Sequence, residues 1–287
     1  MFSLKAPAKI NLALEILGDL PGGYHQLDSL FATLDLADEL HWREAAQTSL
    51  RLGGEVTGLD ISVGEDNLVL RALRALEGAC GRTLPLEIEL IKRIPAGGGL
   101  GGGSADAAAL LYGVNQSHAL GFSLQRLQEL AAPLGADVAF GVRGGLARGT
   151  GRGDQLEALP VPPSHPLILI LPPFFCPTGA VYRAWDAERW RPAQGKVQAS
   201  LPFFQAGQWG PLADILGNDL EPAAEAVQPQ LAEIRQALVA RGLGPVLLCG
   251  SGSTMSCWGG TLQEVAAAVA PWNCRTVAAE VTGAARS

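Results

Sequence analysis

Alternating hydrophobic and polar positions mark the first element that the sequence predicts. In the segment KINLALEIL, at residues 9–17, every second residue is isoleucine or leucine, and the residues between them include Lys9 and Asn11. A repeat of two residues is typical of a β-strand with one buried face. The pattern therefore predicts a strand here, with Lys9 and Asn11 on the same face.

Similar patterns along the chain predict a mixture of strands and helices. A turn signal at residues 19–23 ends the first strand, and more strand is expected up to about residue 52. Further strands are predicted at residues 86–91, 167–171, 246–248 and 254–258. Amphipathic or alanine-rich helices are predicted at residues 66–77 (with Asp66 as N-cap), 104–112, 123–132 and 225–240. This mixture indicates an α+β fold.

Seven prolines within residues 160–177 mark a change in composition. We expect a domain boundary at or just before this stretch, which divides the chain into residues 1–158 and 159–287. The segment at residues 185–209 carries three tryptophans and only weak periodicity. We interpret these tryptophans as packing residues rather than as cofactor contacts.

A glycine-rich segment lies between the strand predicted at residues 86–91 and the helix predicted at residues 104–112. Its residues are Pro95, Ala96, Gly97, Gly98, Gly99, Leu100, Gly101, Gly102, Gly103, Ser104 and Ala105. Glycine has no Cβ and lets a bulky anion approach the backbone, and the free N–H groups at a helix start favour phosphate. The segment predicts a phosphate-binding loop, and a flexible linker is the alternative.

Two common nucleotide-binding motifs do not explain this loop. A Walker A loop needs Gly-Lys-Ser or Gly-Lys-Thr at its end, and this chain has Gly103-Ser104-Ala105 there. The dinucleotide pattern G-x-G-x-x-G is formally present, but Phe122 stands where that motif needs an acidic residue after a second strand.

Composition excludes several other classes of protein. The 287 residues carry a net charge of −7 and are 48% hydrophobic, so the chain can bury a core and offers no clustered cations for nucleic acid. The N-terminus lacks the apolar region of a signal peptide, and the longest aliphatic run, at residues 167–171, is too short to span a bilayer. Five cysteines without C-x-x-C spacing favour free thiols over disulfides or zinc. We therefore expect a cytoplasmic protein without nucleic-acid or membrane partners.

The glycine loop resembles the central motif of the GHMP kinase superfamily, and further segments match that family in order. They are Ala6–Leu12, Gly23–His25 with Leu30-Phe31, Glu65–Leu68, Leu134–Val138, Asn218–Glu221 and Gly250–Ser253. The resemblance spans nearly the whole chain and is weakest at residues 180–215. Ala139 and Ala105 depart from it, since a proline and a second hydroxyl residue are usual at these positions.

This resemblance implies a two-domain α+β fold, with a ribosomal protein S5 domain 2-like N-terminal ATP-binding domain and a ferredoxin-like C-terminal substrate domain. The implied reaction transfers the γ-phosphoryl group of ATP to the 2-hydroxyl of a methylerythritol linked to cytidine diphosphate, in a non-mevalonate route to isoprenoids. The implied cofactors are ATP and Mg²⁺, with Mg²⁺ held mainly by substrate phosphates and no protein metal cage. The implied partners are these small molecules, and the expected state is a monomer or weak homodimer.

Other readings stay open at this point. Another GHMP kinase would act on homoserine, mevalonate or a sugar, and Gly23-Tyr24-His25 together with the glycines at 101–103 argues against it. A non-catalytic nucleotide-binding module is the alternative from a different class. The presence of both Lys9 and Asp137 argues against that module, because binding alone does not need the pair.

The resemblance assigns the catalytic pair to Asp137 and Lys9. Asp137 would accept or orient the proton of the attacking hydroxyl, although a turn aspartate is its plain reading. Lys9 would lie against Asp137, keep that carboxylate ionised and offset charge on the attacking oxygen. Ser104 would open the following helix and cap it, touch a phosphate or help to hold a metal.

The resemblance also suggests contacts to both substrates. Tyr24 and Tyr182 would stack on the cytosine, and His25 would read the edge of the base. Thr178 would contact the sugar or tetritol, Asn11 would face the acceptor substrate, and Asn67 would lie on the adenine side. A helix-start role for Asn67 and a core role for Tyr24 remain alternatives. The loop at residues 250–253 is expected to close over the phosphate or tetritol end, with a plain hairpin turn as the alternative.

Overall fold

The structure is a computed structural model that describes residues 1–54, 61–160, 163–188, 190, 194–210, 212, 215–283 and 285–286. Its strands are β1 Phe2–Leu20, β2 Tyr24–Glu44, β3 Ser49–Gly54, β4 Leu86–Lys92, β5 Leu146–Gly151, β6 Gln155–Leu159, β7 His165–Leu171, β8 Gly217–Asn218, β9 Val246–Leu248, β10 Met255–Cys257 and β11 Arg275–Thr282. Its helices are α1 Leu68–Cys80, α2 Gly102–Ser117, α3 Leu124–Ala131, α4 Ala136–Arg143, α5 Thr178–Glu188, α6 Lys196–Gln205, α7 Glu221–Val227, α8 Gln230–Val239 and α9 Leu262–Val269, with a short 3₁₀ turn at Ala270–Trp272.

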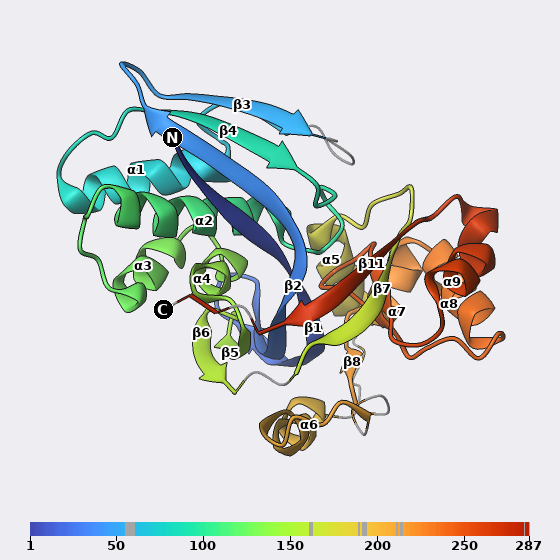
Figure 1. Cartoon of the computed structure of the whole chain (residues 1–287). Helices are drawn as coiled ribbons and strands as arrows, with labels where there is room; N and C mark the ends of the chain where they lie inside the picture. Colours follow the sequence, from blue (N-terminus) through green and yellow to red (C-terminus); the bar gives the residue numbers. More distant parts are fainter. Residues whose placement is uncertain are drawn as a thin grey trace.

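One continuous sheet connects the two halves of the chain. Its main path runs β3-β4-β2-β11-β7-β10-β9 (Figure 1), and β1 lies off this path, paired with β2 in a long hairpin. The C-terminal strand β11 pairs with β7 along its length and with β2 at Leu34 and Thr33. The short strand β8 lies parallel to β1 at Ala13 and Leu14. Strands from the second half of the chain therefore complete the sheet of the first half.

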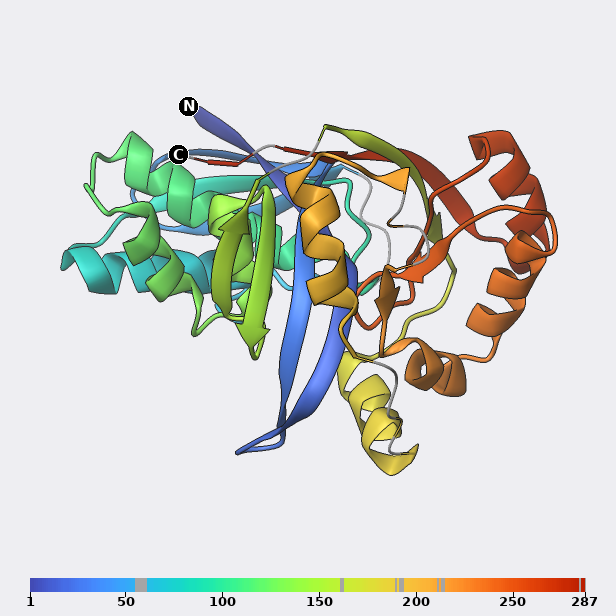
Figure 2. The ribbon, with the colours of Figure 1, turned by 90° about the horizontal axis from the view of Figure 1, so that it is seen from below.

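Helices cover the sheet in two groups, which form two lobes on either side of the long hairpin (Figure 2). Helices α1 to α4 pack with β1, β2 and β4 around a core that includes Leu40, Leu73 and Leu110. Helices α5 and α7 to α9 pack with the end of the sheet formed by β7, β9 and β10, around Ile170 and Ile234. Every helix among the described residues is too short or too polar to cross a membrane.

The predicted elements are largely present, with three corrections. The N-cap of α1 is Asn67 rather than Asp66, because the Asn67 side chain accepts a hydrogen bond from the Val69 amide at 2.9 Å. The helix predicted at residues 225–240 is two helices, α7 and α8, interrupted at residues 228–229, where Pro229 has no amide hydrogen to continue the first helix. Ser104 is the third residue of α2 and does not open it, since Gly101 is the N-cap.

The tryptophan-rich segment forms α5, α6 and the chain around them. Trp185 is buried and its ring contacts Trp190, while the rings of Trp209 and His165 stack at 5.0 Å. The prediction of a packing role is confirmed for these tryptophans. The start of α6 is held by the buried Glu15 carboxylate of β1, which accepts hydrogen bonds from three successive amides at residues 195–197. These bonds satisfy the free N–H groups at the helix start.

Candidate active site

A cavity of about 720 Å³ lies between the two halves of the chain. It is lined by the glycine loop at residues 95–104, by the start of α4 and by residues of β1 and β2. Arg152, Thr178, Tyr182, Gly250 and Ser251 are also among its lining residues. Such a volume is typical of sites for small molecules.

The glycine loop presents free backbone amides to this cavity. Gly97, Gly99 and Gly101 have φ of 75°, 81° and 68°, a region that residues with a Cβ rarely adopt. The first helical hydrogen bond of α2 runs from the Ala105 amide to the Gly101 carbonyl at 2.8 Å. The amides of residues 102–104 therefore precede the helical pattern, and together with the helix dipole they can bind an anion.

The loop at residues 249–254 packs directly against the glycine loop. A Cβ placed on Gly99 would lie 2.1 Å from the Cys249 carbonyl oxygen, so only glycine fits there. The Thr254 amide donates to the Gly98 carbonyl at 3.2 Å. A Cβ on Gly250 would lie 3.5 Å from the Lys9 ammonium nitrogen. The loop that the sequence places at the phosphate or tetritol end thus contacts both the glycine loop and Lys9.

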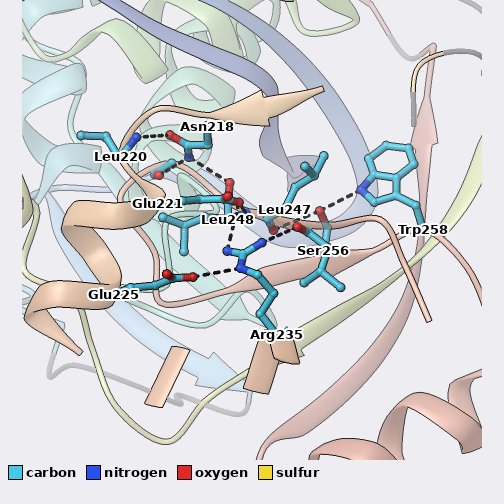
Figure 3. A network of polar contacts seen from close by, with 11 residues as sticks. Asn218, Leu220, Glu221, Glu225, Arg235, Leu247, Leu248, Ser256 and Trp258 are labelled. Atoms are coloured by element: carbon cyan, nitrogen blue, oxygen red, sulfur yellow. Dashed lines mark hydrogen bonds and ion pairs between the residues drawn. The ribbon is translucent and has the colours of Figure 1, made fainter. Parts of the chain in front are cut away.

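A buried polar network holds this second loop in place (Figure 3). The Asn218 side-chain amide donates to the Leu248 carbonyl at 3.0 Å and to the Gly250 carbonyl at 2.6 Å, and its oxygen accepts from the Leu220 amide. The Glu221 carboxylate accepts from the Leu248 amide at 2.8 Å and pairs with Arg235 at 3.1 Å. The segment Asn218–Glu221 therefore connects β8, and through it β1, to the loop that faces the cavity.

Lys9 and Asp137 face each other in the cavity. The Lys9 Nζ lies 3.2 Å from Asp137 Oδ2 and 2.8 Å from Asn11 Oδ1. Strand periodicity predicts Lys9 and Asn11 on one face, and this is confirmed. The Asn11 amide in turn donates to the Ser29 hydroxyl at 2.8 Å. Lys9 is buried, whereas the Asp137 side chain keeps 32% of its surface exposed to the cavity.

Asp137 is placed by the start of α4. It lies in the first turn of that helix, after Gly135 with φ of 154°. The positive end of the helix dipole favours a carboxylate at this position. Asp137 is therefore also a turn residue at a helix start, as its local sequence suggests. The neighbouring Lys9 and the open cavity distinguish Asp137 from an aspartate that only caps a helix. This arrangement gives a carboxylate that is held by a cation and still accessible to a substrate hydroxyl.

Two of the residues expected to bind the acceptor substrate, Thr178 and Tyr182, line the cavity. The Thr178 and Ser251 hydroxyls are 2.8 Å apart, which joins α5 to the second loop. The ring of Tyr182 stacks on the His25 ring at 4.8 Å. Burial, with a contribution from the negative charge of Asp137, raises the pKa of Tyr182 to about 12, so its phenol stays protonated. The structure thus brings Thr178, Tyr182, Lys9 and Asp137 around one cavity.

Tyr24 and His25 occupy different environments although they are adjacent in sequence. The Tyr24 side chain is 53% exposed and lies under the Arg152 guanidinium at 5.0 Å. His25 is buried behind Tyr182, and neither it nor Tyr24 is part of the cavity wall. Asn67 lines another part of the cavity and also caps α1. A role at the helix start is therefore compatible with a role in binding.

Sequence reasoning missed a buried charge cluster beneath the glycine loop. Lys92 pairs with Asp38, and its ammonium lies 2.7 Å from Asp106 Oδ2. A Cβ on Gly102 would lie 3.4 Å from the same ammonium. Burial raises the pKa of Asp106 to about 8. A lysine directly after a predicted strand and an aspartate in a predicted helix are the only signals, and neither indicates that the two side chains meet.

Comparison with known proteins identifies the family. Family models match residues 67–147, as the GHMP kinases N terminal domain, and residues 200–278, as the GHMP kinases C terminal region. A 4-diphosphocytidyl-2-C-methyl-D-erythritol kinase from Pelotomaculum thermopropionicum is 43% identical over 251 residues, which cover 87% of this chain and 86% of that protein. The kinase of the same name from Moorella thermoacetica is 40% identical over 258 residues, with 88% of each chain covered.

A solved structure gives the same result. The crystal structure of a 4-(cytidine 5'-diphospho)-2C-methyl-D-erythritol kinase superposes with a TM-score of 0.79 at 34% identity, and the match covers 99% of this chain and 100% of the other. The fold is that of a GHMP kinase. The chain belongs to the GHMP kinase family, in the branch named 4-diphosphocytidyl-2-C-methyl-D-erythritol kinase. The predicted family and its two-domain α+β fold are confirmed.

Proposed function

We propose that the protein transfers the γ-phosphoryl group of ATP to the 2-hydroxyl of 4-diphosphocytidyl-2-C-methyl-D-erythritol, giving ADP and the 2-phosphate. The observation that supports this reaction most directly is the 3.2 Å contact between Lys9 and Asp137 in the cavity that the glycine loop lines. The names of the relatives supply the substrate. The pair, the loop and the cavity together are what phosphoryl transfer to an alcohol requires.

The acceptor hydroxyl lies against Asp137 in this proposal. Its carboxylate accepts or orients the hydroxyl proton, and the Lys9 ammonium offsets negative charge on the attacking oxygen. The Lys9 ammonium also donates to Asn11 Oδ1 at 2.8 Å, and this second contact helps to hold it beside Asp137. The protein does little covalent work, and alignment of the hydroxyl with the γ-phosphate contributes much of the rate.

The triphosphate binds along the glycine loop. The amides of residues 102–104 and the dipole of α2 hold its phosphate oxygens, and Asn67 lies at the adenine end of the cavity. Lys92 adds positive charge behind the loop, although its buried carboxylate partners neutralise much of it. Pro95, Ala96 and Leu100 line the same part of the cavity, and Leu100 is buried in the core beneath it.

Mg²⁺ fits the oxygen donors of this cavity. The Ser104 hydroxyl is the group that would hold it beside the substrate phosphates. When bound, the ion neutralises charge on the transferring phosphoryl group. Because Mg²⁺ keeps many ligands from water and phosphate, it does not need a protein cage.

The acceptor substrate extends toward α5. Thr178 and Tyr182 bind its sugar and base ends, His25 reads the base edge, and Tyr24 covers the base from the outside. The division of the chain after residue 158 belongs to the same proposal, with ATP contacts mostly before it and part of the acceptor contacts after it. The separate hydrophobic clusters around α1–α4 and around α5 and α7–α9 support this division.

A coupled ADP-release assay with ATP and Mg²⁺ tests the proposal. The cytidine diphosphate substrate is compared with mevalonate, homoserine and galactose at equal concentration. We expect turnover on the cytidine compound alone. Turnover on one of the other alcohols would keep the kinase and discard the substrate, and ATP binding without turnover on all four would favour a binding module.

A further inference from the structure

The C-terminal tail of the chain packs against the end of α4, beside which Figure 1 shows it. The Arg286 amide donates to the Arg143 carbonyl at 2.7 Å, and the Arg286 guanidinium donates to the Gly141 carbonyl at 3.0 Å. Carbonyls in the last turn of a helix have no partner within the helix, and a cation there also interacts favourably with the helix dipole. The tail therefore caps the helix whose first turn carries Asp137.

The same guanidinium also reaches α2 and β1. It donates to the Ala108 carbonyl of α2 at 3.4 Å and to the Lys5 carbonyl of β1 at 3.1 Å, and it lies over the Tyr112 ring at 5.1 Å. A planar guanidinium can bond several carbonyls at once, because its five N–H donors point in fixed directions. Burial lowers the pKa of Arg286 to about 10, so the group still carries its charge near neutral pH. One side chain thus joins three elements.

Each carbonyl that the guanidinium contacts lies four residues from a residue that lines the candidate active site. The three pairs are Gly141 with Asp137 on α4, Ala108 with Ser104 on α2, and Lys5 with Lys9 on β1. Four residues span about 6 Å along a helix and about 13 Å along a strand. The helices nearly touch beside these contacts, since a Cβ on Gly141 would lie 2.9 Å from the Ala108 Cβ. Arg286 therefore fixes the three elements close to the groups that must align.

We propose that Arg286 is a positioning residue for phosphoryl transfer, which holds α2, α4 and β1 so that the glycine loop, Asp137 and Lys9 stay aligned. This inference rests on the proposed function, because it assigns the reaction to that loop and that pair. The rate of such a transfer depends on alignment, and a displacement of about 1 Å caused by a distant substitution can lower it by up to about 10²-fold. Binding of each substrate is spread over many contacts and depends less on this alignment.

The kinetics of two variants of the full-length enzyme test the proposal. Arg286→Met removes the guanidinium donors, and we expect kcat to fall roughly tenfold or more while KM for both substrates changes less than about threefold. Asn115→Asp is the control, since Asn115 bonds the Phe122 backbone and its substitution should weaken α2 without lowering kcat. Both are assayed at a temperature where circular dichroism shows complete folding. Equal kcat losses in the two variants, or a higher KM at unchanged kcat, would overturn the inference.

A third variant keeps the charge and changes its shape. Arg286→Lys retains a cation at the end of α4 but lacks the planar fork, so kcat should lie between those of the wild-type enzyme and Arg286→Met. If Arg286→Met does not fold, wild-type kcat in a folded Arg286→Lys enzyme would overturn the inference. Unchanged kcat in a folded Arg286→Met enzyme would refute the role of Arg286 alone. Failure of the wild-type enzyme to turn over the cytidine substrate would instead refute the proposed function, and the positioning role with it.

Discussion

The two ends of the cavity are built in different ways. The phosphate end is made mostly of backbone: glycines in a left-handed conformation, the free amides of α2 and a second glycine-containing loop against them. The end proposed for the acceptor is made of side chains from segments far apart in sequence, such as Thr178 with Ser251 and Tyr182 stacked on His25 behind it. A backbone site depends on close approach and tolerates little change in shape. A side-chain site can change its ligand preference while the fold stays intact.

Removal of the carboxylate between the two ends should have the largest effect. We expect Asp137→Ala to lower kcat by about 10²- to 10⁴-fold, the usual contribution of a general base. The affinity for ATP should be retained, because the glycine loop does not depend on Asp137. Steady-state kinetics and calorimetric titration with ATP measure the two quantities. A near-normal kcat would remove Asp137 from the mechanism.

The close backbone packing at the glycine loop can be tested with two separate glycine-to-alanine substitutions. Gly99→Ala places a methyl group 2.1 Å from the Cys249 carbonyl at a φ of 81°, and it should lower the free energy of unfolding by about 2 to 4 kcal/mol. Gly103→Ala is the control, because its nearest neighbour is the Leu68 side chain at 3.7 Å. Denaturant unfolding compares the two. Equal stability of both variants would contradict the interlocked loops.

The support beneath the second loop should have a smaller but selective effect. Asn218→Asp keeps the acceptor for the Leu220 amide but turns an oxygen toward the Leu248 and Gly250 carbonyls. We expect a loss of about 1 to 3 kcal/mol of stability and a several-fold lower kcat. Asn115→Asp is the matched control. Asn115 is equally buried, and its side chain forms hydrogen bonds with the amide and the carbonyl of Phe122, away from the cavity. It should lose stability without a loss of kcat, and similar kcat losses in both would refute a positioning role for Asn218.

The contrast between local backbone structure and long-range side-chain contacts also explains which features could be predicted from the sequence. The glycine loop, the shared face of Lys9 and Asn11 and the strand at residues 86–91 follow from local pattern, because each depends on neighbours along the chain. Local sequence pattern does not predict elements whose structure is determined by contacts with distant parts of the chain. The strand β11 was not predicted from RTVAAEVT, yet pairing with β7 and β2 makes it a strand.

Fine placement of side chains fails for the same reason. By local pattern alone Asp137 looks like a turn residue. The family resemblance predicts that it lies against Lys9, more than a hundred residues earlier, and the 3.2 Å contact confirms that placement. Ser104 looks like a helix start, but Gly101 and the loop packed against it set that start instead. The pairing of His25 with Asp186 has no local signal, because the two residues are 161 positions apart.

Tyr24 provides the mildest test of the acceptor end. Its ring is half exposed under Arg152 and outside the cavity wall, so stacking on a base should lie at or below the weak end of the usual range. We expect Tyr24→Ala to raise KM for the cytidine substrate by roughly fivefold with little change in kcat. Tyr182→Ala, which opens the buried wall and releases His25, should raise KM more. If Tyr24→Ala has the larger effect on KM, then the β1–β2 hairpin tip must close over the base when substrate binds, and the acceptor end is formed by movement rather than held in advance. A loss confined to kcat would instead contradict stacking by Tyr24.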